Sequence, residues 1–520
     1  MVETARAEKQ RDRLEREKER HIIEATMKDD LAKINLDEYK LDPPVRKLFE
    51  QLLNHIEILT KENRQLKEEN QQLRDENARL KGEKGKPNIK ANKKEEQKSE
   101  ADEKKKEQTK RFEKKEAIGE RSERIKIDRA EVRKLDRNEL PKDVEHRGYR
   151  DVVIQNIKFE SDNVLYRLER MYSSGEEKFY EAKLPEGLGG QRYGNELRAF
   201  ILRQYFELRI PQEKILEMLR SEAVVISAGE ISEIITHKHI ELFEPERKEI
   251  VLAGLASSSY QNIDDTAGRE DGVNQYVTVI CNPHFSSFYT NKKKDAETVA
   301  NLLSDLAATP DIAPLESERQ AKTLDEYIDI LMADDAKQFH GQTRVRALCW
   351  VHEERHYKKL NPYFEEHRKS VEEFRNDIWD YYKQLQAYKA QPSEQEKERL
   401  SKAFDELFSR TTGYADLDHR IALTREKKAQ LLVVLDYPEI PLHNNEAELA
   451  VREFVIKRKI SNGTRSKDGS KAWDIYLSLL GTCRKLGVNF YRYVLDRISN
   501  SFSMPALAEI ICHQAQPVPT

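Results

Sequence analysis

A seven-residue leucine spacing is the most regular hydrophobic pattern in the chain. Five leucines keep this spacing, and a second series lies three positions before them: Leu52, Leu59, Leu66, Leu73 and Leu80, preceded by Phe49, Ile56, Asn63, Asn70 and Asn77. Leucine at one core position and asparagine at the other are typical of a parallel two-stranded coiled coil, because a buried asparagine fixes the register. The pattern predicts a leucine-zipper coiled coil over residues 46–84, pairing two copies through residues 49–80. A single solvated helix is the alternative.

The segments around this zipper are too polar to build a core. Residues 1–45 form a charged N-terminal segment, and residues 85–137 consist mostly of charged and amide side chains. The second stretch buries too little apolar surface to fold alone, so we interpret it as a linker. Residues 138–190 alternate β-type and polar residues around a Ser-Ser-Gly-Glu-Glu turn and contain no cysteine, which predicts a small β-rich module without a cysteine-based metal site.

Residues 191–257 return to a helical pattern in three segments. Pro211 occupies a first-turn position of the second segment, and Ser227 and Glu230 have the capping-box spacing at the start of the third. Three short helices of this kind suit a helix-turn-helix DNA-binding module. Simple helical packing suits them as well, because the third segment is rich in glutamate, which phosphate repels. Both interpretations stay open.

From residue 258 the pattern alternates between strands and helices. A helix is expected near residues 295–307, and the strand candidates read YQNID, QYVTVICN, HFSSFYT, DILMA and RVRALCW. A charged, helix-rich insertion follows at residues 363–430. The pattern predicts an α/β core over residues 258–362 and 431–500, with a C-terminal tail at residues 501–520.

Composition limits the classes of protein that fit. Of the 520 residues 36% are charged, yet the net charge is only −4, so a basic surface for nucleic acid would be local. Four widely spaced cysteines give no sign of a disulfide framework or a cysteine-rich zinc module. Because no apolar run approaches the roughly 18 residues that span a bilayer, and the N-terminus is charged where a signal peptide is apolar, a cytoplasmic protein without a membrane partner is expected.

Acidic residues supply the candidate chemistry. Asp264-Asp265 and Asp334-Asp335 end two predicted strands, and Glu448 lies in a helix-like phrase. Converging carboxylates repel one another unless hard cations lie between them, and Mg²⁺ prefers such oxygen ligands. Two ions held in this way activate a nucleophile and stabilise a leaving oxygen in phosphodiester transfer. Aspartate is also a routine turn residue, and strand alternation lets only one member of each pair face a site.

Other side chains near these acids have two readings each. The cations that follow Glu448 suit DNA phosphates, or else form a solvated helix face: Arg452, Lys457, Arg458, Lys459 and Arg465. His352 suits a role on the scissile phosphate near neutral pH, or a structural pairing with Cys349. Zinc held by Cys349 and His352 alone is not expected, because two ligands fall short of four.

Four blocks of sequence resemble the bacterial DDE transposases of the insertion sequence 66 family. The resemblance covers roughly residues 190–500 in order. Three features depart from it: Asp265 stands where the family has glutamate, His443 stands where the family has aspartate, and residues 138–185 lack the cysteine-rich zinc module. The matching blocks are Asp264-Asp265-Thr266, Asp334 with Phe339, Cys349-Trp350-Val351-His352 with Arg355, and Asn444-Asn445-Glu446-Ala447-Glu448 with Arg452, Arg458 and Lys459.

The resemblance implies a fold, a site and an activity. The core would be an RNase H-like fold with a helical insertion, in which Asp264, Asp334 and Glu448 are the catalytic metal ligands. The auxiliary candidates are Asp265, Asp335, His352 and Arg355. The expected cofactor is two Mg²⁺ ions, for which Mn²⁺ can substitute.

The implied activity is that of a DNA transposase in the bacterial cytoplasm, associated with the nucleoid. It would cut the ends of a mobile element and transfer the strands to target DNA, as a homodimer or larger assembly, with accessory proteins as further candidate partners. A catalytically inactive DNA-binding regulator and a Mg²⁺-dependent nuclease are the alternatives.

Overall fold

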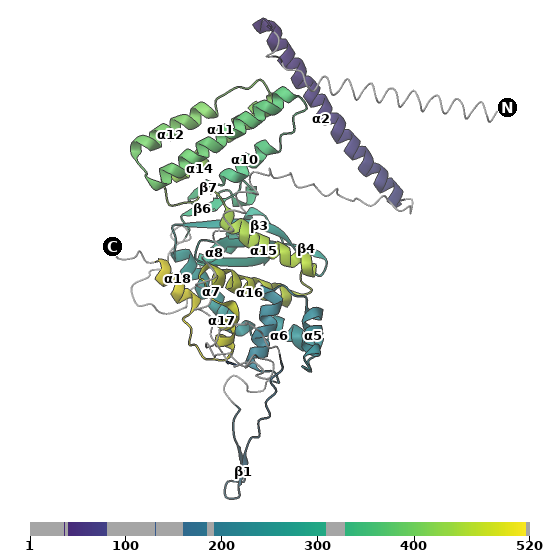
Figure 1. Cartoon of the computed structure of the whole chain (residues 1–520), viewed down its shortest axis with the longest axis vertical. Helices are drawn as coiled ribbons and strands as arrows, with labels where there is room; N and C mark the ends of the chain where they lie inside the picture. The colour runs from purple at the N-terminus through teal and green to yellow at the C-terminus, as the bar shows by residue number, and fades with distance from the viewer. Residues whose placement is uncertain are drawn as a thin grey trace, which may run out of the picture. The chain divides into compact units, whose positions relative to one another are not determined.

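A computed structural model of the chain describes residues 36, 40–80, 130–131, 160–184, 192–307 and 328–515. The chain divides into two compact units, Met1–Leu66 with Asn163–Thr520, and Lys67–Asp162. Almost all of the predicted linker and the first half of the predicted β-rich module lie outside the described residues. The elements that carry the predicted site belong to the first unit (Figure 1).

The zipper sequence forms one long helix, α2 (Pro43–Leu80). Four of its regularly spaced leucines remain about half exposed: Leu52 (48%), Leu59 (59%), Leu66 (57%) and Leu73 (53%). An apolar stripe at seven-residue spacing is the surface that a second coiled-coil helix covers. The helix is therefore present as predicted, and the pairing of two copies stays a prediction.

A hairpin and a group of helices precede the sheet. The hairpin pairs β1 (Arg170–Ser173) with β2 (Lys178–Glu181) in antiparallel fashion. The helices are α4 (Asn195–Leu202), the π-helical turn η3 (Arg203–Glu207), α5 (Gln212–Ser221), α6 (Ala228–Thr236) and α7 (Ile240–Ala256).

The helical segment contains one α-helix more than the sequence predicts. Ser227 caps α6 as expected, accepting a hydrogen bond from the backbone N–H of Glu230 at 3.1 Å. The chain then leaves helical geometry at His237, where α6 ends, and α7 begins at Ile240. The long third segment of the prediction is thus two helices, because a turn without glycine or proline interrupts it.

A five-stranded mixed sheet forms the centre of the core. Its strands are β3 (Tyr260–Glu270), β4 (Val273–Cys281), β5 (Ser286–Asn291), β6 (Ile330–Ala333) and β7 (Val345–Leu348), in the order β5-β4-β3-β6-β7. Strands β3, β4 and β5 are antiparallel, whereas β6 and β7 run parallel to β3. All five predicted strands are present, and so is the predicted helix, as α8 (Ala296–Ala307).

Helices cover the sheet and form the insertion. After β7 come α10 (Trp350–Lys358), α11 (Glu365–Ala390), α12 (Glu394–Leu407), α13 (Ala415–Arg425) and α14 (Lys428–Leu431), with the 3-10 turns η4 (Lys337–Phe339) before β7 and η5 (Val433–Leu435) after α14. The chain then forms α15 (Asn445–Ser461), α16 (Lys467–Lys485), α17 (Phe490–Ile498) and α18 (Leu507–Ala515). None of the helices in the described part of the chain is both long and apolar enough to cross a membrane.

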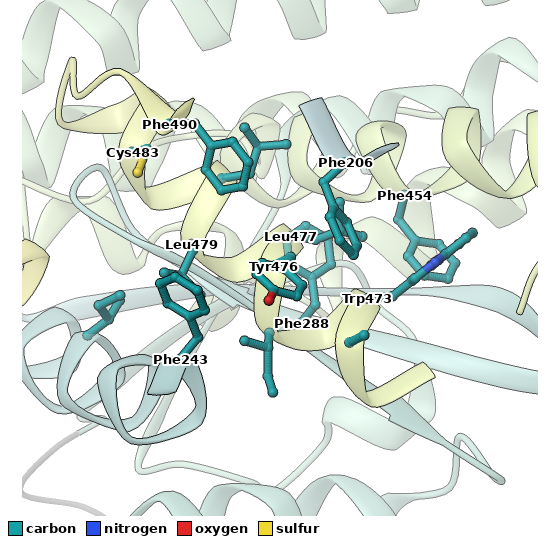
Figure 2. Close-up of a cluster of buried hydrophobic side chains, with 14 of the residues drawn as sticks. Phe206, Phe243, Phe288, Phe454, Trp473, Tyr476, Leu477, Leu479, Cys483 and Phe490 are labelled. Atoms are coloured by element: carbon teal, nitrogen blue, oxygen red, sulfur yellow. The ribbon is translucent and has the colours of Figure 1, made fainter. Parts of the chain in front are cut away.

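Strand β6 shows how the sheet is buried between two layers. All four of its residues are buried, and they alternate between two hydrophobic clusters. Leu331 and Ala333 join the larger cluster, in which Trp473, Tyr476 and other aromatic side chains of the C-terminal helices interdigitate (Figure 2). Ile330 and Met332 face the aromatic cluster of the insertion. A strand buried on both faces is apolar throughout, as the run ILMA is.

Helix α2 docks onto the insertion with the side of the helix that does not carry the leucine stripe. Leu53 is 4% exposed and packs with Phe364. Glu57 accepts a hydrogen bond from the backbone N–H of Phe364 at 3.1 Å, at the start of α11. Asn54 accepts one from the backbone N–H of Ala415 at 2.9 Å, at the start of α13. Residues of α2 therefore satisfy N-terminal donors of two helices whose own N-cap residues make no side-chain hydrogen bond.

Candidate active site at the ends of strands β3 and β6

Strand register brings the first acid of each predicted pair to the same place. The last parallel pair between β3 and β6 is Asn262 with Met332, so Asp264 and Asp334 each lie two residues beyond it. Neighbouring strands are about 4.8 Å apart. Strand β3 itself continues to Glu270, paired with β4. The prediction that Asp264-Asp265 ends its strand was therefore wrong: only the parallel pairing ends there.

Asp264 is a carboxylate in an unfavourable environment. Its Oδ1 accepts a hydrogen bond from the backbone N–H of Asp265 at 2.8 Å. Burial, together with the negative charges of Asp334, Asp265 and Glu448, raises the pKa of Asp264 to about 7, against that hydrogen bond. Among the residues that the structure describes, no cation lies within ion-pairing distance of either aspartate. Two adjacent acids without a counter-ion are a pair that an added cation would stabilise.

The second acid of each pair is occupied by protein cations. Asp265 lies 3.5 Å from the ammonium of Lys294 and accepts a hydrogen bond from Gln338. Asp335 lies 2.6 Å from Lys427 and 3.4 Å from Arg346. Burial raises the pKa of Asp335, but the two cations outweigh it and hold the pKa below its ordinary range. These ion pairs bear on which aspartate of each pair would bind a metal, because within the described residues Asp264 and Asp334 are the two without a cation beside them.

Glu448 comes to the site on helix α15. Its Oε2 accepts a hydrogen bond from Arg355 at 3.1 Å, and its Oε1 lies 3.5 Å from Nδ1 of His352. Both partners belong to α10, which begins directly after β7. Burial lowers the pKa of His352, which leaves the imidazole mainly neutral near pH 7, although the charge of Glu448 opposes this shift. Two of the four predicted auxiliary residues therefore contact the glutamate.

Asn444 joins the elements that carry the site, and its role was not foreseen. It is fully buried. Its amide accepts a hydrogen bond from Asn262 and donates one to the carbonyl of Ile263, both at 2.8 Å. Its backbone N–H donates to Sγ of Cys349 at 3.2 Å, and its carbonyl accepts from Glu448 N–H at 3.0 Å. These hydrogen bonds of Asn444 join the start of α15 to β3 and are called the Asn444 clamp. Asn262 and Asp264 share one face of β3, so Asp264 lies on the face that the clamp joins to α15.

A cavity of about 650 Å³ opens beside Asp334. Its lining includes His352 and Arg355 and three cations that the sequence did not single out, Lys359, Arg420 and Lys427. The last two pair with acids already, since Arg420 and Lys427 both contact Glu353. Lys359 is exposed at the rim. No sequence signal marks these residues, because the insertion folds back onto α10 only in the tertiary structure.

Comparison with known proteins agrees with this architecture. The sequence model described as "Transposase IS66 family" matches residues 190–472, more than half of the chain. The chain belongs to the transposase IS66 family. It is also 32% identical over 322 residues to the uncharacterized protein y4jO of Sinorhizobium fredii, covering 51% of this chain and 99% of that protein. No solved structure matches.

The family assignment supports a transposase role, and the structure revises which cations are available to DNA. In this member of the family, Arg452, Lys459 and Arg465 are exposed and make no ion pair within the described residues. The first two lie on the same face of α15 as Glu448, four and eleven residues further on. Arg458 is occupied in part, because its guanidinium donates to the carbonyl of Ala267 in β3.

Lys457 was wrongly predicted to bind DNA. Its side chain is fully buried, and Nζ donates to the carbonyl of Tyr205 at 2.7 Å while lying 3.4 Å from the centre of that ring. Burial lowers the pKa of Lys457 to about 7. The reason is helical geometry: nine residues are two and a half turns, so Lys457 lies on the side of α15 opposite Glu448 and enters the protein core.

Proposed function

We propose that the chain is a DDE-type DNA transposase in which Asp264, Asp334 and Glu448 hold the catalytic cations. The observation that carries the proposal is the pair Asp264, on β3, and Asp334, directly after the neighbouring β6, neither of which has an ion-pair partner among the described residues. A fold that buries like charges together loses stability unless a ligand restores it. Site residues that lower stability in the free protein are a mark of function.

The strand order β5-β4-β3-β6-β7, with three antiparallel strands and two parallel ones, supports an RNase H-like core. Asp264 lies on the central strand, Asp334 follows its parallel neighbour, and Glu448 comes from a helix packed on β3 and β4. The insertion between α10 and α15 separates Asp334 from Glu448 in sequence while leaving the sheet intact. The order of the acids is the one that the DDE resemblance implies.

The residues present fit Mg²⁺, with Mn²⁺ able to substitute. Hard oxygen donors without competing cations suit these ions, and a partly open site leaves room for their waters. When bound, two such ions activate water or a 3′-hydroxyl and stabilise the leaving oxygen. Asp264 and Asp334 would hold the ions, and Glu448 would complete the set while Arg355 keeps its carboxylate oriented.

DNA would lie along the exposed face of α15. Arg452 and Lys459 follow Glu448 on that face, so they are placed to hold phosphates to one side of the one that reacts. Two copies joined through the leucine stripe of α2 would carry two active sites, which suits an element with two ends. The proposed reaction is strand cleavage at each end, followed by in-line attack of the new 3′-hydroxyl on target DNA.

The test is cleavage of DNA that carries an element end, with Mg²⁺, by the full-length protein. Asp264→Asn and Glu448→Gln each keep the shape of the side chain and remove a ligand charge, so we expect both to abolish cleavage while DNA binding, measured by gel shift, survives. Cleavage at the parental rate by either variant would overturn the assignment. Cleavage without strand transfer by the parent would favour a nuclease, and no cleavage would favour a DNA-binding regulator.

A further inference from the structure

Glu448 also belongs to a second cluster, with Cys349 and His352. One ligand atom from each of these three side chains lies within 4.8 Å of the other two. Within the described part of the chain, this is the group of histidine, cysteine and acidic side chains gathered this closely. The three aspartate and glutamate residues of the proposed Mg²⁺ site are not gathered to that extent.

Local structure explains why Cys349 and His352 meet. Cys349 is the N-cap of α10 and His352 is its third residue, the two positions whose side chains approach each other in a capping box. The thiol is 2% exposed. Its sulfur accepts a hydrogen bond from the backbone N–H of Asn444 at 3.2 Å. Burial raises the pKa of the Cys349 thiol although nearby backbone donors lower it, so a cation bound here has to displace the thiol proton.

Two atoms of the cluster lack a partner. Nδ1 of His352 and Oε1 of Glu448 are buried without a hydrogen bond within the described residues, and they face each other at 3.5 Å. The other atom of each group is occupied by Arg355, at 3.0 Å from Nε2 and 3.1 Å from Oε2. Unsatisfied buried polar atoms are costly, and one nitrogen of His352 and one oxygen of Glu448 lie within 4.8 Å of the sulfur of Cys349.

We propose that Cys349, His352 and Glu448 form a site for a Zn²⁺-type cation, which shares Glu448 with the proposed Mg²⁺ site and uses two other ligands. A thiolate and a carboxylate neutralise its two charges, the imidazole adds a third ligand, and water completes a tetrahedron. Soft sulfur and imidazole ligands select such an ion over Mg²⁺. Donor atoms around tetrahedral zinc are roughly 3.3–3.8 Å apart, so the cluster must close by about 1 Å.

Metal binding would release one proton and rearrange the hydrogen bonds that Arg355 makes. On binding, the Cys349 thiol releases its proton to solvent. Coordination through Nδ1 requires the imidazole proton on Nε2, so the contact between Arg355 and Nε2 opens. Arg355 keeps its hydrogen bond to Oε2 of Glu448, which then binds the metal through Oε1 alone. The bound glutamate is withdrawn from Asp264 and Asp334, which makes zinc an inhibitor of cleavage; this last consequence rests on the proposed function.

The binding test uses the full-length protein without DNA and Co²⁺ as a spectroscopic substitute for Zn²⁺. We expect one Co²⁺ per chain with a thiolate-to-cobalt charge-transfer band, displaced by Zn²⁺ and not by excess Mg²⁺. Cys349→Ser should abolish the band, whereas Cys512→Ser, which changes a cysteine on α18, should keep it. His352→Gln should weaken Co²⁺ binding at least tenfold, whereas His356→Gln, one turn further along α10, should not.

Thermal unfolding of each variant separates loss of a ligand from loss of the fold, and His352→Gln leaves the buried thiol in place. A band that survives in Cys349→Ser, or equal binding by the two histidine variants, overturns the site. Asp264→Asn distinguishes the two proposals, since it should keep the cobalt band and lose Mg²⁺-dependent cleavage. Zinc binding that leaves parental cleavage unchanged would retain the site and overturn its inhibitory role.

Discussion

In the pairs Asp264-Asp265 and Asp334-Asp335, the two acids are neighbours in sequence but differ in whether a protein cation lies beside them. Asp265 and Asp335 have protein cations beside them, and in Asp335 these cations hold the pKa low. Asp264 and Asp334 have none in the part of the chain that the structure describes, and the pKa of Asp264 is raised to about 7. The first arrangement stabilises the fold with its own residues. The second leaves charge uncompensated, which is useful only where a ligand from outside supplies the compensation.

This difference distinguishes the acids that stabilise the fold through ion pairs from the acids that are available to a ligand. Successive side chains of a strand point to opposite faces, so Asp265 points away from the face of β3 that Asp264 shares with Asn262. The face away from α15 holds Lys294 and Gln338, contributed by the segments around α8 and η4. Substituting each acid in turn tests directly which one stabilises the fold and which one binds a cation.

The largest expected effect separates Asp334 from Asp335. Asp334→Asn should lower the rate of Mg²⁺-dependent cleavage by about 10³-fold with little change in stability, because it removes a ligand charge and no ion pair. Asp335→Asn leaves Lys427 and Arg346 without their acid and should lower the free energy of unfolding by about 1–2 kcal/mol. Cleavage assays and urea unfolding measure the two effects. The opposite result for the two variants would exchange their roles.

The contrast between occupied and open faces also applies to helix α2. Leu53 is buried against the insertion, whereas Leu59 and Leu66 are more than half exposed. Charging both exposed leucines, Leu59→Asp with Leu66→Asp, should raise the dissociation constant of the dimer at least about 100-fold, since each copy would bury two carboxylates. Sedimentation velocity measures this constant. Gln65→Asp is the control on the same helix, and an unchanged oligomeric state in the leucine variant would refute the zipper.

The raised pKa of Asp264 predicts how the free energy of unfolding and the affinity for Mg²⁺ depend on pH. Because the folded pKa of Asp264, about 7, exceeds its ordinary 3.8, the cation-free fold retains a proton that the unfolded chain releases. This group therefore makes the free energy of unfolding fall as pH rises from about 4 through 7. Mg²⁺ expels the proton, so its affinity should rise through pH 7.

Asp264→Asn should remove this pH dependence. At pH 8 without divalent cations, the variant should be more stable than the parent by about 1–2 kcal/mol, allowing for partial exposure of the carboxyl. Urea unfolding with and without Mg²⁺ measures the difference. A variant that is less stable than the parent at pH 8 would mean that Asp264 has a favourable partner in the fold.

The smallest expected effect extends the comparison from acids to cations. Arg452→Ala and Lys459→Ala should each weaken DNA binding several-fold at physiological salt, and each should reduce the salt slope by about 0.9. Lys402→Ala, which removes an exposed cation from α12, is the charge-matched control. Lys457→Met should leave DNA affinity unchanged because Lys457 is buried. Fluorescence anisotropy across a salt series measures all four.

Local patterns were enough to predict the elements. The runs YQNID, QYVTVICN and DILMA became β3, β4 and β6, because β-branched and apolar residues at these positions suit a sheet buried between layers. The leucine spacing became α2, and Ser227 capped α6. These predictions depend on residues a few positions apart, whose interactions do not require the rest of the chain.

Long-range contacts were beyond that reach. No sequence signal around Lys457 indicates that its ammonium donates a hydrogen bond to the carbonyl of Tyr205, 252 residues earlier. The clamp made by Asn444 joins residues 181 and 95 positions away, Ile263 and Cys349. A helical-wheel argument would have placed Lys457 opposite Glu448, but only packing decided that this opposite face is the interior.

By itself, then, the sequence determined the strands, the helices, the family resemblance and the three acids worth testing, since propensity, periodicity and motif spacing are local. Tertiary structure alone decided which aspartate of each pair lacks a counter-ion, which lysine of the Lys457–Lys459 run is buried, and that Cys349 and His352 gain a third ligand in Glu448. The physical reason is that burial and electrostatics depend on distances in space, and those are set only when the sheet, the insertion and α15 pack together.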